Sequence, residues 1–155
     1  MELRIVAVGE RMPDWVAEGV QTYAGRMPPT LPVRLVVVPA SGRRRGGDTA
    51  RAMAEEGGRL LEASSGCVRV ALDEQGREVD TAGIARWLDD WMMDGRDVAF
   101  LIGGADGLDR DTRAAADRTW SLSALTFPHM LVRVILAEQL YRAWTVLNHH
   151  PYHRA

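Results

Sequence analysis

The chain has 155 residues, of which 46% are hydrophobic and 26% are charged, and this ordinary composition excludes an intrinsically disordered protein. Its formal net charge of -2 excludes a strongly basic nucleic-acid-binding protein, so any contact with RNA has to come from local groups of charges. A single cysteine, Cys67, excludes an intrachain disulfide, and the complete absence of lysine excludes a catalytic lysine, a Schiff base and a P-loop lysine.

The elements expected from the sequence alternate between strands and helices. In chain order they are a strand over residues 3–8, a helix over 13–26, a strand over 33–38, a helix over 49–63, a strand over 68–72, a turn over 73–77, a helix over 81–93 with Thr81 as its cap, a strand over 98–102, a short helix over 109–116, a short strand over 120–122 and a long helix over 128–147. This alternation predicts a single α/β domain over residues 1–155 with a mainly parallel sheet.

The first residues and the apolar runs bear on localisation. No run approaches the length that spans a bilayer, and the first eight residues lack the basic segment and long apolar core of a signal peptide. We therefore expect a cytoplasmic protein.

Ligands of parallel α/β folds bind beyond the carboxyl ends of strands. The loops after the third and fourth strands and before the last helix are therefore the expected places for a ligand.

A glycine-rich turn, residues 103–107, follows the most apolar strand directly. Its spacing is neither that of the dinucleotide fingerprint nor that of a P-loop, so it is either a tight turn or a loop that brings backbone close to a ligand. The segment over residues 121–129 is rich in small residues and ends in Pro128 and His129. It is either a structural start of the last helix or a stretch whose free backbone groups grip a base edge.

The last helix is apolar on nearly every side, which predicts burial on several sides and makes a dimer interface plausible. Glu138 and Arg142 interrupt this surface at i, i+4 spacing. They form either a helix-stabilising ion pair or a polar pair that lines an active site. His129, close to the helix start, is either a local hydrogen-bonding residue or a functional one.

The tail over residues 148–154 holds three of the four histidines together with Tyr152 and Arg154. Adjacent histidines point apart, no carboxylate or cysteine completes a ligand set, and Pro151 restricts the geometry, so we expect no metal site. Tyrosine stacks on bases, histidine titrates near neutral pH and arginine holds phosphate, a mixture that suits RNA recognition. The alternative is a frayed terminus without a function.

Several stretches together resemble the ribosomal large-subunit methyltransferase H family, which are SPOUT-class enzymes. They comprise residues 1–13, Leu72-Asp73, residues 94–97, Leu101-Ile102-Gly103-Gly104, residues 121–129, Arg133 through Tyr141-Arg142-Ala143-Trp144, and residues 148–154. The likeness runs the whole length of the chain. The chain departs from the family pattern at Ala105-Asp106, where Pro-Glu is frequent, at Phe127, where leucine is usual, and at the additional last residue, Ala155.

The resemblance implies a parallel-sheet SPOUT fold whose C-terminal segment forms a trefoil knot, and a homodimer that uses S-adenosylmethionine to methylate N3 of a pseudouridine in 23S rRNA within the ribosome. It implies cofactor contacts, largely through backbone, from Leu72, Gly103, Gly104, Ser123, Ala124, Leu125, Thr126, Phe127 and Pro128. We assign catalytic duties to Glu138, Arg142, His153 and Arg154. Contacts with the substrate are assigned to His129, Tyr152, His153 and Arg154.

The proton on N3 has to leave during methyl transfer, so a base or bulk water has to accept it, and His153 and Glu138 are the candidate bases. Two other classes of protein remain open from the residues alone. One is a flavodoxin-like nucleotide-binding enzyme, whose phosphate would sit on the turn over residues 103–107. The other is a ribosome-binding module without catalytic activity.

Overall fold

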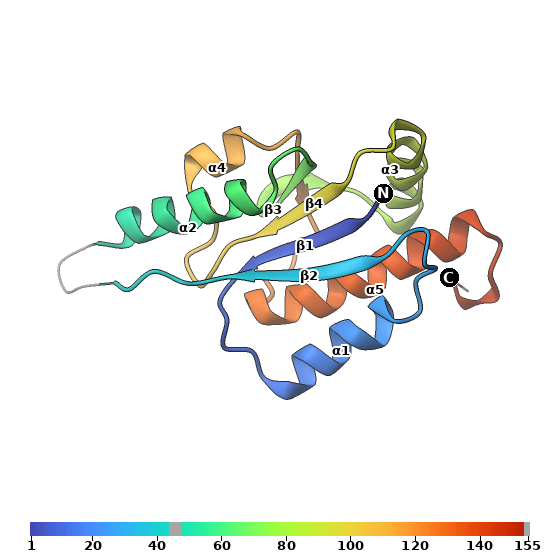
Figure 1. Ribbon diagram of the computed structural model, residues 1–155, viewed down its shortest axis with the longest axis horizontal. Helices are drawn as coiled ribbons and strands as arrows, with labels where there is room; N and C mark the ends of the chain where they lie inside the picture. The colour runs from blue at the N-terminus through green and yellow to red at the C-terminus, as the bar shows by residue number, and fades with distance from the viewer. Residues whose placement is uncertain (44–47, 154–155) are drawn as a thin grey trace.

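The computed structural model describes residues 1–43 and 48–153. They form one five-stranded sheet with helices on both faces (Figure 1). The strands are β1 (Leu3–Val8), β2 (Val33–Val38), β3 (Val68–Glu78), β4 (Val98–Ile102) and β5 (Arg118–Ser121). All neighbouring strands are parallel, in the order β2-β1-β4-β3-β5, which confirms the predicted α/β class.

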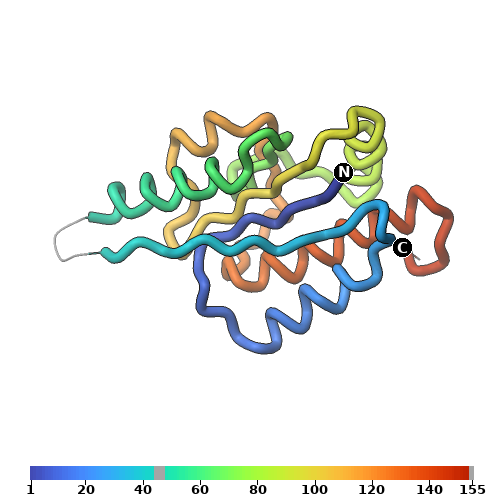
Figure 2. The backbone as a smooth tube through the Cα atoms, in the orientation of Figure 1, coloured from blue at the N-terminus to red at the C-terminus, as the bar shows by residue number. Residues whose placement is uncertain are grey.

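The helices form a layer on each face of this sheet. They are α1 (Asp14–Ala24), α2 (Thr49–Ala63), α3 (Thr81–Asp94), α4 (Arg110–Ala114) and α5 (His129–Leu147), followed by a 3-10 turn, η1 (Pro151–His153). One layer consists of α1, α3 and α5, with α5 in contact with both of the others, and α2 and α4 form the other layer (Figure 2). Within the described residues, no helix is long and apolar enough to cross a membrane.

The central strands are apolar throughout because both faces of the sheet are covered. Leu3, Ile5 and Ala7 of β1 belong to the core shared with α1, α3 and α5, whereas Val6 and Val8 belong to the smaller core beneath α2 and α4. All residues of β4 are buried in the same way. Successive side chains of a strand point to opposite faces, so an unbroken apolar run fills two cores at once.

Two local predictions are wrong. The turn expected over residues 73–77 lies within β3, which shifts register there and continues beside β5. Gly76 makes this possible, since a Cβ at that position would lie 2.8 Å from the backbone nitrogen of Trp120. Thr81 does not cap α3; Asp80 does, by accepting a hydrogen bond of 2.8 Å from a backbone N–H of the first turn. Thr81 instead donates its hydroxyl to Gln139 of α5 at 2.8 Å.

Candidate active site

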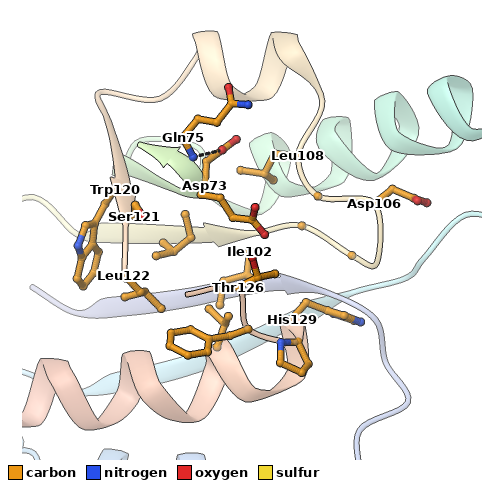
Figure 3. Close-up of a pocket in the computed structure, with 18 of the residues that line it drawn as sticks. Asp73, Gln75, Ile102, Asp106, Leu108, Trp120, Ser121, Leu122, Thr126 and His129 are labelled. Carbon is orange, nitrogen blue, oxygen red and sulfur yellow. Dashed lines mark hydrogen bonds between the residues drawn. The ribbon is translucent and has the colours of Figure 1, made fainter. Parts of the chain in front are cut away.

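A cavity of about 700 Å³ lies beyond the carboxyl ends of β4 and β5, beside the register shift of β3 and the start of α5 (Figure 3). This edge of a parallel sheet is where α/β folds bind ligands, and the volume lies in the range of small-molecule sites. The wall combines apolar side chains, carboxylates and glycine-rich backbone. Most of it comes from residues 72–75, 102–108, 120–123 and 125–129.

The glycine-rich turn after β4 forms one side of the cavity. A Cβ on Gly103 would collide with the backbone of Gly107 and lie 2.7 Å from the backbone nitrogen of Leu108. Gly107 has a φ of +80° and donates its N–H to the carbonyl of Gly104 at 3.0 Å. The segment is therefore a tight turn, and the same compactness exposes its backbone to the cavity.

The segment between β5 and α5 forms the opposite side. Ser121 donates its hydroxyl to the carbonyl of Ser123 at 2.9 Å, and the Ser123 hydroxyl accepts from the N–H of Leu125 at 3.0 Å. These local bonds fix the turn. Within the described residues, the backbone groups of Thr126 and Phe127 make no hydrogen bond, so they are available to a ligand in the cavity.

Asp73 brings a carboxylate to the wall of the cavity. Figure 3 shows it beside Gln75, whose N–H donates to Asp73 Oδ1 at 2.8 Å. Arg113 of the segment after β4 pairs with Asp73 Oδ2 at 3.1 Å. The carboxylate is thus held from two sides at the cavity wall, where a bound ligand would face it.

His129 begins α5 and lines the same cavity. Its Nδ1 is buried and has no hydrogen-bond partner in the described part of the chain. Burial, and then the charge of Arg133, lower the pKa of His129 below its ordinary value, which keeps the imidazole neutral near pH 7. Arg133 is fully buried and donates to the carbonyls of Val8 and Gly9 at 2.9 Å each.

A second polar cluster lies further along α5. It consists of Glu138, Arg142 and Tyr152, and we call it the Glu138 cluster. Arg142 donates from Nε to Glu138 Oε1 at 2.7 Å, and the Tyr152 hydroxyl donates to the same oxygen at 3.0 Å. The Arg142 guanidinium also lies over the Tyr152 ring, 5.0 Å from its centroid. Burial, and then the bond to Glu138, raise the pKa of Tyr152, so its hydroxyl stays protonated. The predicted ion pair of Glu138 and Arg142 is confirmed, and η1 adds a tyrosine to it.

The comparisons with known proteins decide the family. Residues 1–153 match the family described as "Predicted SPOUT methyltransferase". The chain belongs to the SPOUT methyltransferase family. The ribosomal RNA large subunit methyltransferase H of Alkalilimnicola ehrlichii is 55% identical over 155 residues, which is 100% of both chains. The protein of the same name from Thioalkalivibrio sulfidiphilus is 54% identical over 155 residues, 99% of both chains.

These relatives confirm the resemblance inferred from the sequence, and solved structures agree on the fold. A probable methylase family protein from Haemophilus influenzae superposes with a TM-score of 0.62 at 12% identity, covering 99% of this chain and 70% of that one. A probable methyltransferase from Bordetella pertussis gives 0.58 at 19% identity, covering 91% of this chain and 95% of that one. The SPOUT assignment removes the flavodoxin-like alternative.

In this SPOUT methyltransferase the residues predicted to bind the cofactor gather around one cavity. All of them line it except Ala124, which is exposed in the same turn; the lining members are Leu72, Gly103, Gly104, Ser123, Leu125, Thr126, Phe127 and Pro128. His129, predicted to contact the substrate, lines it too.

Those predicted catalytic residues that the structure describes do not line that cavity within one chain. Glu138 lies nine residues after His129, about 14 Å along the helix axis at 1.5 Å per residue. Neither it nor Arg142, Tyr152 or His153 lines the cavity. His153 has a buried Nδ1 without a partner in the described residues, and Arg154 lies outside them.

Sequence reasoning assigned no role to Asp73 and Arg113, which the fold brings together at the cavity wall. Asp73 directly follows the apolar part of β3, at the point where the strand shifts register and faces the ligand edge of the sheet, so the end of the apolar run was a usable signal. Arg113 carried no such signal, since it lies in a short helix whose placement depends on the rest of the fold.

Proposed function

We propose that this SPOUT methyltransferase acts in the cytoplasm as a homodimer that transfers a methyl group from S-adenosylmethionine to N3 of a pseudouridine in 23S rRNA within the ribosome. The observation that carries the proposal is the cavity itself: eight of the nine residues that the sequence assigns to the cofactor line it. The names of the closely similar relatives support an rRNA substrate. The C-terminal trefoil knot and the single domain over residues 1–155 remain predictions from the resemblance.

The cavity suits S-adenosylmethionine in size and in chemistry. Its volume of about 700 Å³ accommodates a nucleoside with an amino-acid arm. The free backbone groups of Thr126 and Phe127 can pair with the edge of an adenine, which needs both a donor and an acceptor. Asp73 on the wall is paired with Arg113, whereas Glu74 makes no ion pair within the described residues and its carboxylate favours a cofactor that carries positive charge.

When bound, S-adenosylmethionine supplies a methyl group that is bonded to a positively charged sulfur. A nitrogen that attacks this methyl group in line displaces the sulfur, which leaves as a neutral thioether. The protein then has to hold the uracil ring so that N3 faces that methyl group, and much of the acceleration comes from this positioning. The neutral imidazole of His129 at the cavity wall can hydrogen-bond to a base without repelling the cationic cofactor. Arg142 and Tyr152 supply a cation and an aromatic ring for the nucleotide.

The N3 proton leaves as the bond from N3 to the methyl carbon forms, and a base of the chain or bulk water has to accept it. Glu138 already accepts hydrogen bonds from Arg142 and Tyr152 on Oε1 and from Gln139 on Oε2, so both of its oxygens are engaged. His153 Nδ1 has no partner within the described residues. Between the two candidates from the sequence, this difference favours His153.

A stripe along α5 supports a dimer. Leu131, Ile135, Glu138 and Arg142 follow one another at spacings of four, three and four residues, which places them on one side of the helix. Leu131 and Ile135 are half-buried, yet they are not among the hydrophobic side chains packed against the described core. A partner subunit packed on this stripe would complete their burial.

The same stripe offers a way to unite the two halves of the site. If two copies of α5 cross in opposite directions near Ile135, the Glu138 cluster of one subunit approaches the start of α5, and hence the cavity, of the other. Each active site would then combine a cofactor cavity from one chain with Glu138, Arg142, Tyr152 and His153 from its partner.

Mixing two impaired variants tests this arrangement, at a cofactor concentration well below what Gly103→Ala needs for binding. Gly103→Ala damages the cavity, and Arg142→Ala damages the cluster while leaving the cavity intact. After the two variants are unfolded and refolded together, half of the dimers are mixed and one of the two sites in each is intact, so about a quarter of the wild-type activity should return. Activity that stays at the level of the separate variants would contradict a shared site.

The near-neutral net charge suggests that the substrate is recognised by the shape of the ribosome and not by strong non-specific affinity for RNA. We expect assembled ribosomal particles to be methylated far faster than a short RNA with the same sequence. Equal rates on both would contradict this expectation. Binding to ribosomes without any methyl transfer would instead favour a non-catalytic module.

A further inference from the structure

Arg43, at the end of the described segment after β2, joins two carboxylates that come from different parts of the chain. Its guanidinium donates to Glu56 of α2 at 2.6 Å and 3.1 Å, and to Asp106 of the turn after β4 at 3.0 Å. The N–H of Ser41 also donates to Glu56, at 3.0 Å. We call these three side chains, Arg43, Glu56 and Asp106, the Arg43 bridge.

The Glu56 end of the bridge is built into the protein interior. Its side chain is only 3% exposed. Burial would raise the pKa of Glu56, but the hydrogen bonds from Arg43 and Ser41 outweigh it and the pKa lies below its ordinary value. The carboxylate is therefore charged near neutral pH and anchors Arg43 firmly to α2, whereas a fully exposed pair would contribute little.

The Asp106 end of the bridge belongs to the cavity wall. Asp106 lies in the turn over residues 104–107, whose backbone lines the cavity, and in Figure 3 its side chain points away from Ile102 and Thr126. Glu56 lies directly behind the same turn, because a Cβ on Gly104 would be 3.8 Å from Glu56 Oε1. Arg43 itself does not line the cavity.

The backbone bond from Gly107 to Gly104 closes the turn, but the side chains at its tip need a further anchor. Ala105, Asp106 and Gly107 are exposed, and Gly107 has a positive φ that glycine adopts freely. Ala105 does not restrict the turn as a proline would. Within the described residues, the side-chain bonds from this tip go to Arg43 alone.

We propose that Arg43 is a positioning residue for the cofactor: through Asp106 it holds the turn over residues 104–107 in the conformation that binds S-adenosylmethionine, with Glu56 as its fixed point. This inference rests on the proposed function, because it takes the cavity to be the S-adenosylmethionine site. Arg43 then raises the affinity for the cofactor without contacting it. It takes no part in the attack of N3 on the methyl group.

Calorimetric titration of S-adenosylmethionine into the full-length protein tests the inference with Arg43→Met, Asp106→Asn and the double variant. Each single variant should weaken cofactor binding about fivefold, which corresponds to about 1 kcal/mol. The double variant should bind no more weakly than the weaker single variant, since both changes break the same connection. In turnover assays, KM for the cofactor should rise, whereas kcat and ribosome affinity should stay at the wild-type values.

Arg51→Met is the matched control, because Arg51 is an exposed arginine of α2 whose acidic neighbours are Asp48 and Glu55. It should bind the cofactor as the wild type does. Wild-type affinity in Arg43→Met would overturn the inference, as would a lower unfolding temperature with unchanged affinity. Additive losses in the double variant would also overturn it, because Asp106 would then act on the cofactor independently of Arg43. A wild-type protein that fails to bind S-adenosylmethionine would refute the proposed function instead.

Discussion

Replacement of Gly103 by alanine should damage both the fold and the cavity in which we propose that the cofactor binds. The added Cβ would collide with the backbone of Gly107 and lie 2.7 Å from the nitrogen of Leu108, and backbone atoms cannot move aside as a flexible side chain does. Gly103 is buried, so the added methyl group cannot move into solvent. Overpacking of this kind costs about 1–3 kcal/mol of the free energy of unfolding. Because the displaced turn lines the cavity, we also expect cofactor affinity to fall about tenfold or more.

The control is Gly58→Ala, which makes the same chemical change in the exposed face of α2. A Cβ on Gly58 has no atom within 4 Å, so alanine should stabilise the helix by about 0.5–1 kcal/mol. Urea unfolding at one fixed protein concentration measures both variants, and calorimetry measures cofactor binding. If Gly103→Ala were as stable as the wild type and bound the cofactor equally well, the description of this turn would be refuted.

Three further predictions concern α5 and the residues around it. Tyr152→Phe removes the hydroxyl that donates to Glu138, so kcat should fall about tenfold while urea unfolding changes by about 1 kcal/mol or less. The native state lowers the pKa of His129 through burial and then Arg133, so stability should decline as the pH falls below about 6.5; His129→Gln should lessen that decline, as measured by urea unfolding at two pH values. Ile135→Glu should yield monomers in sedimentation experiments.

Each of these predictions has a clear contrary result. A wild-type kcat in Tyr152→Phe would show that the hydrogen bond from Tyr152 to Glu138 does not contribute to catalysis. An identical pH dependence of stability in His129→Gln would mean that another group causes the decline. A dimeric Ile135→Glu variant would remove the stripe of α5 from the interface.

The sequence predicts this fold well wherever local pattern and burial agree. The bounds of β1, β2, α2 and β4 match the predictions because each is a run of one periodicity with a clear stop signal. β3 was predicted too short, since Asp73 and Gly76 resemble turn residues and only their proximity to β5 reveals that the strand continues. Asp80 rather than Thr81 caps α3, a difference of one residue that propensity does not resolve.

The cavity beside β3, β4 and β5 was predictable because much of its wall consists of short contiguous segments that follow strands. The Arg43 bridge was not, since Arg43, Glu56 and Asp106 are distant in sequence and meet only after the sheet assembles. For the Glu138 cluster, the contact could be predicted from the sequence but its place in the fold could not. Its i, i+4 spacing predicts the ion pair, but the separation of that pair from the cavity follows from the length of α5 and becomes visible only in the folded chain.

The most direct test of the proposed function follows a labelled methyl group from S-adenosylmethionine into ribosomes that lack the modification, and identifies the modified nucleoside by mass. We predict one labelled nucleoside, a pseudouridine methylated at N3, from 23S rRNA. Label on another nucleoside would contradict the proposed substrate, and no label despite measurable cofactor binding would contradict the proposed reaction on the ribosome.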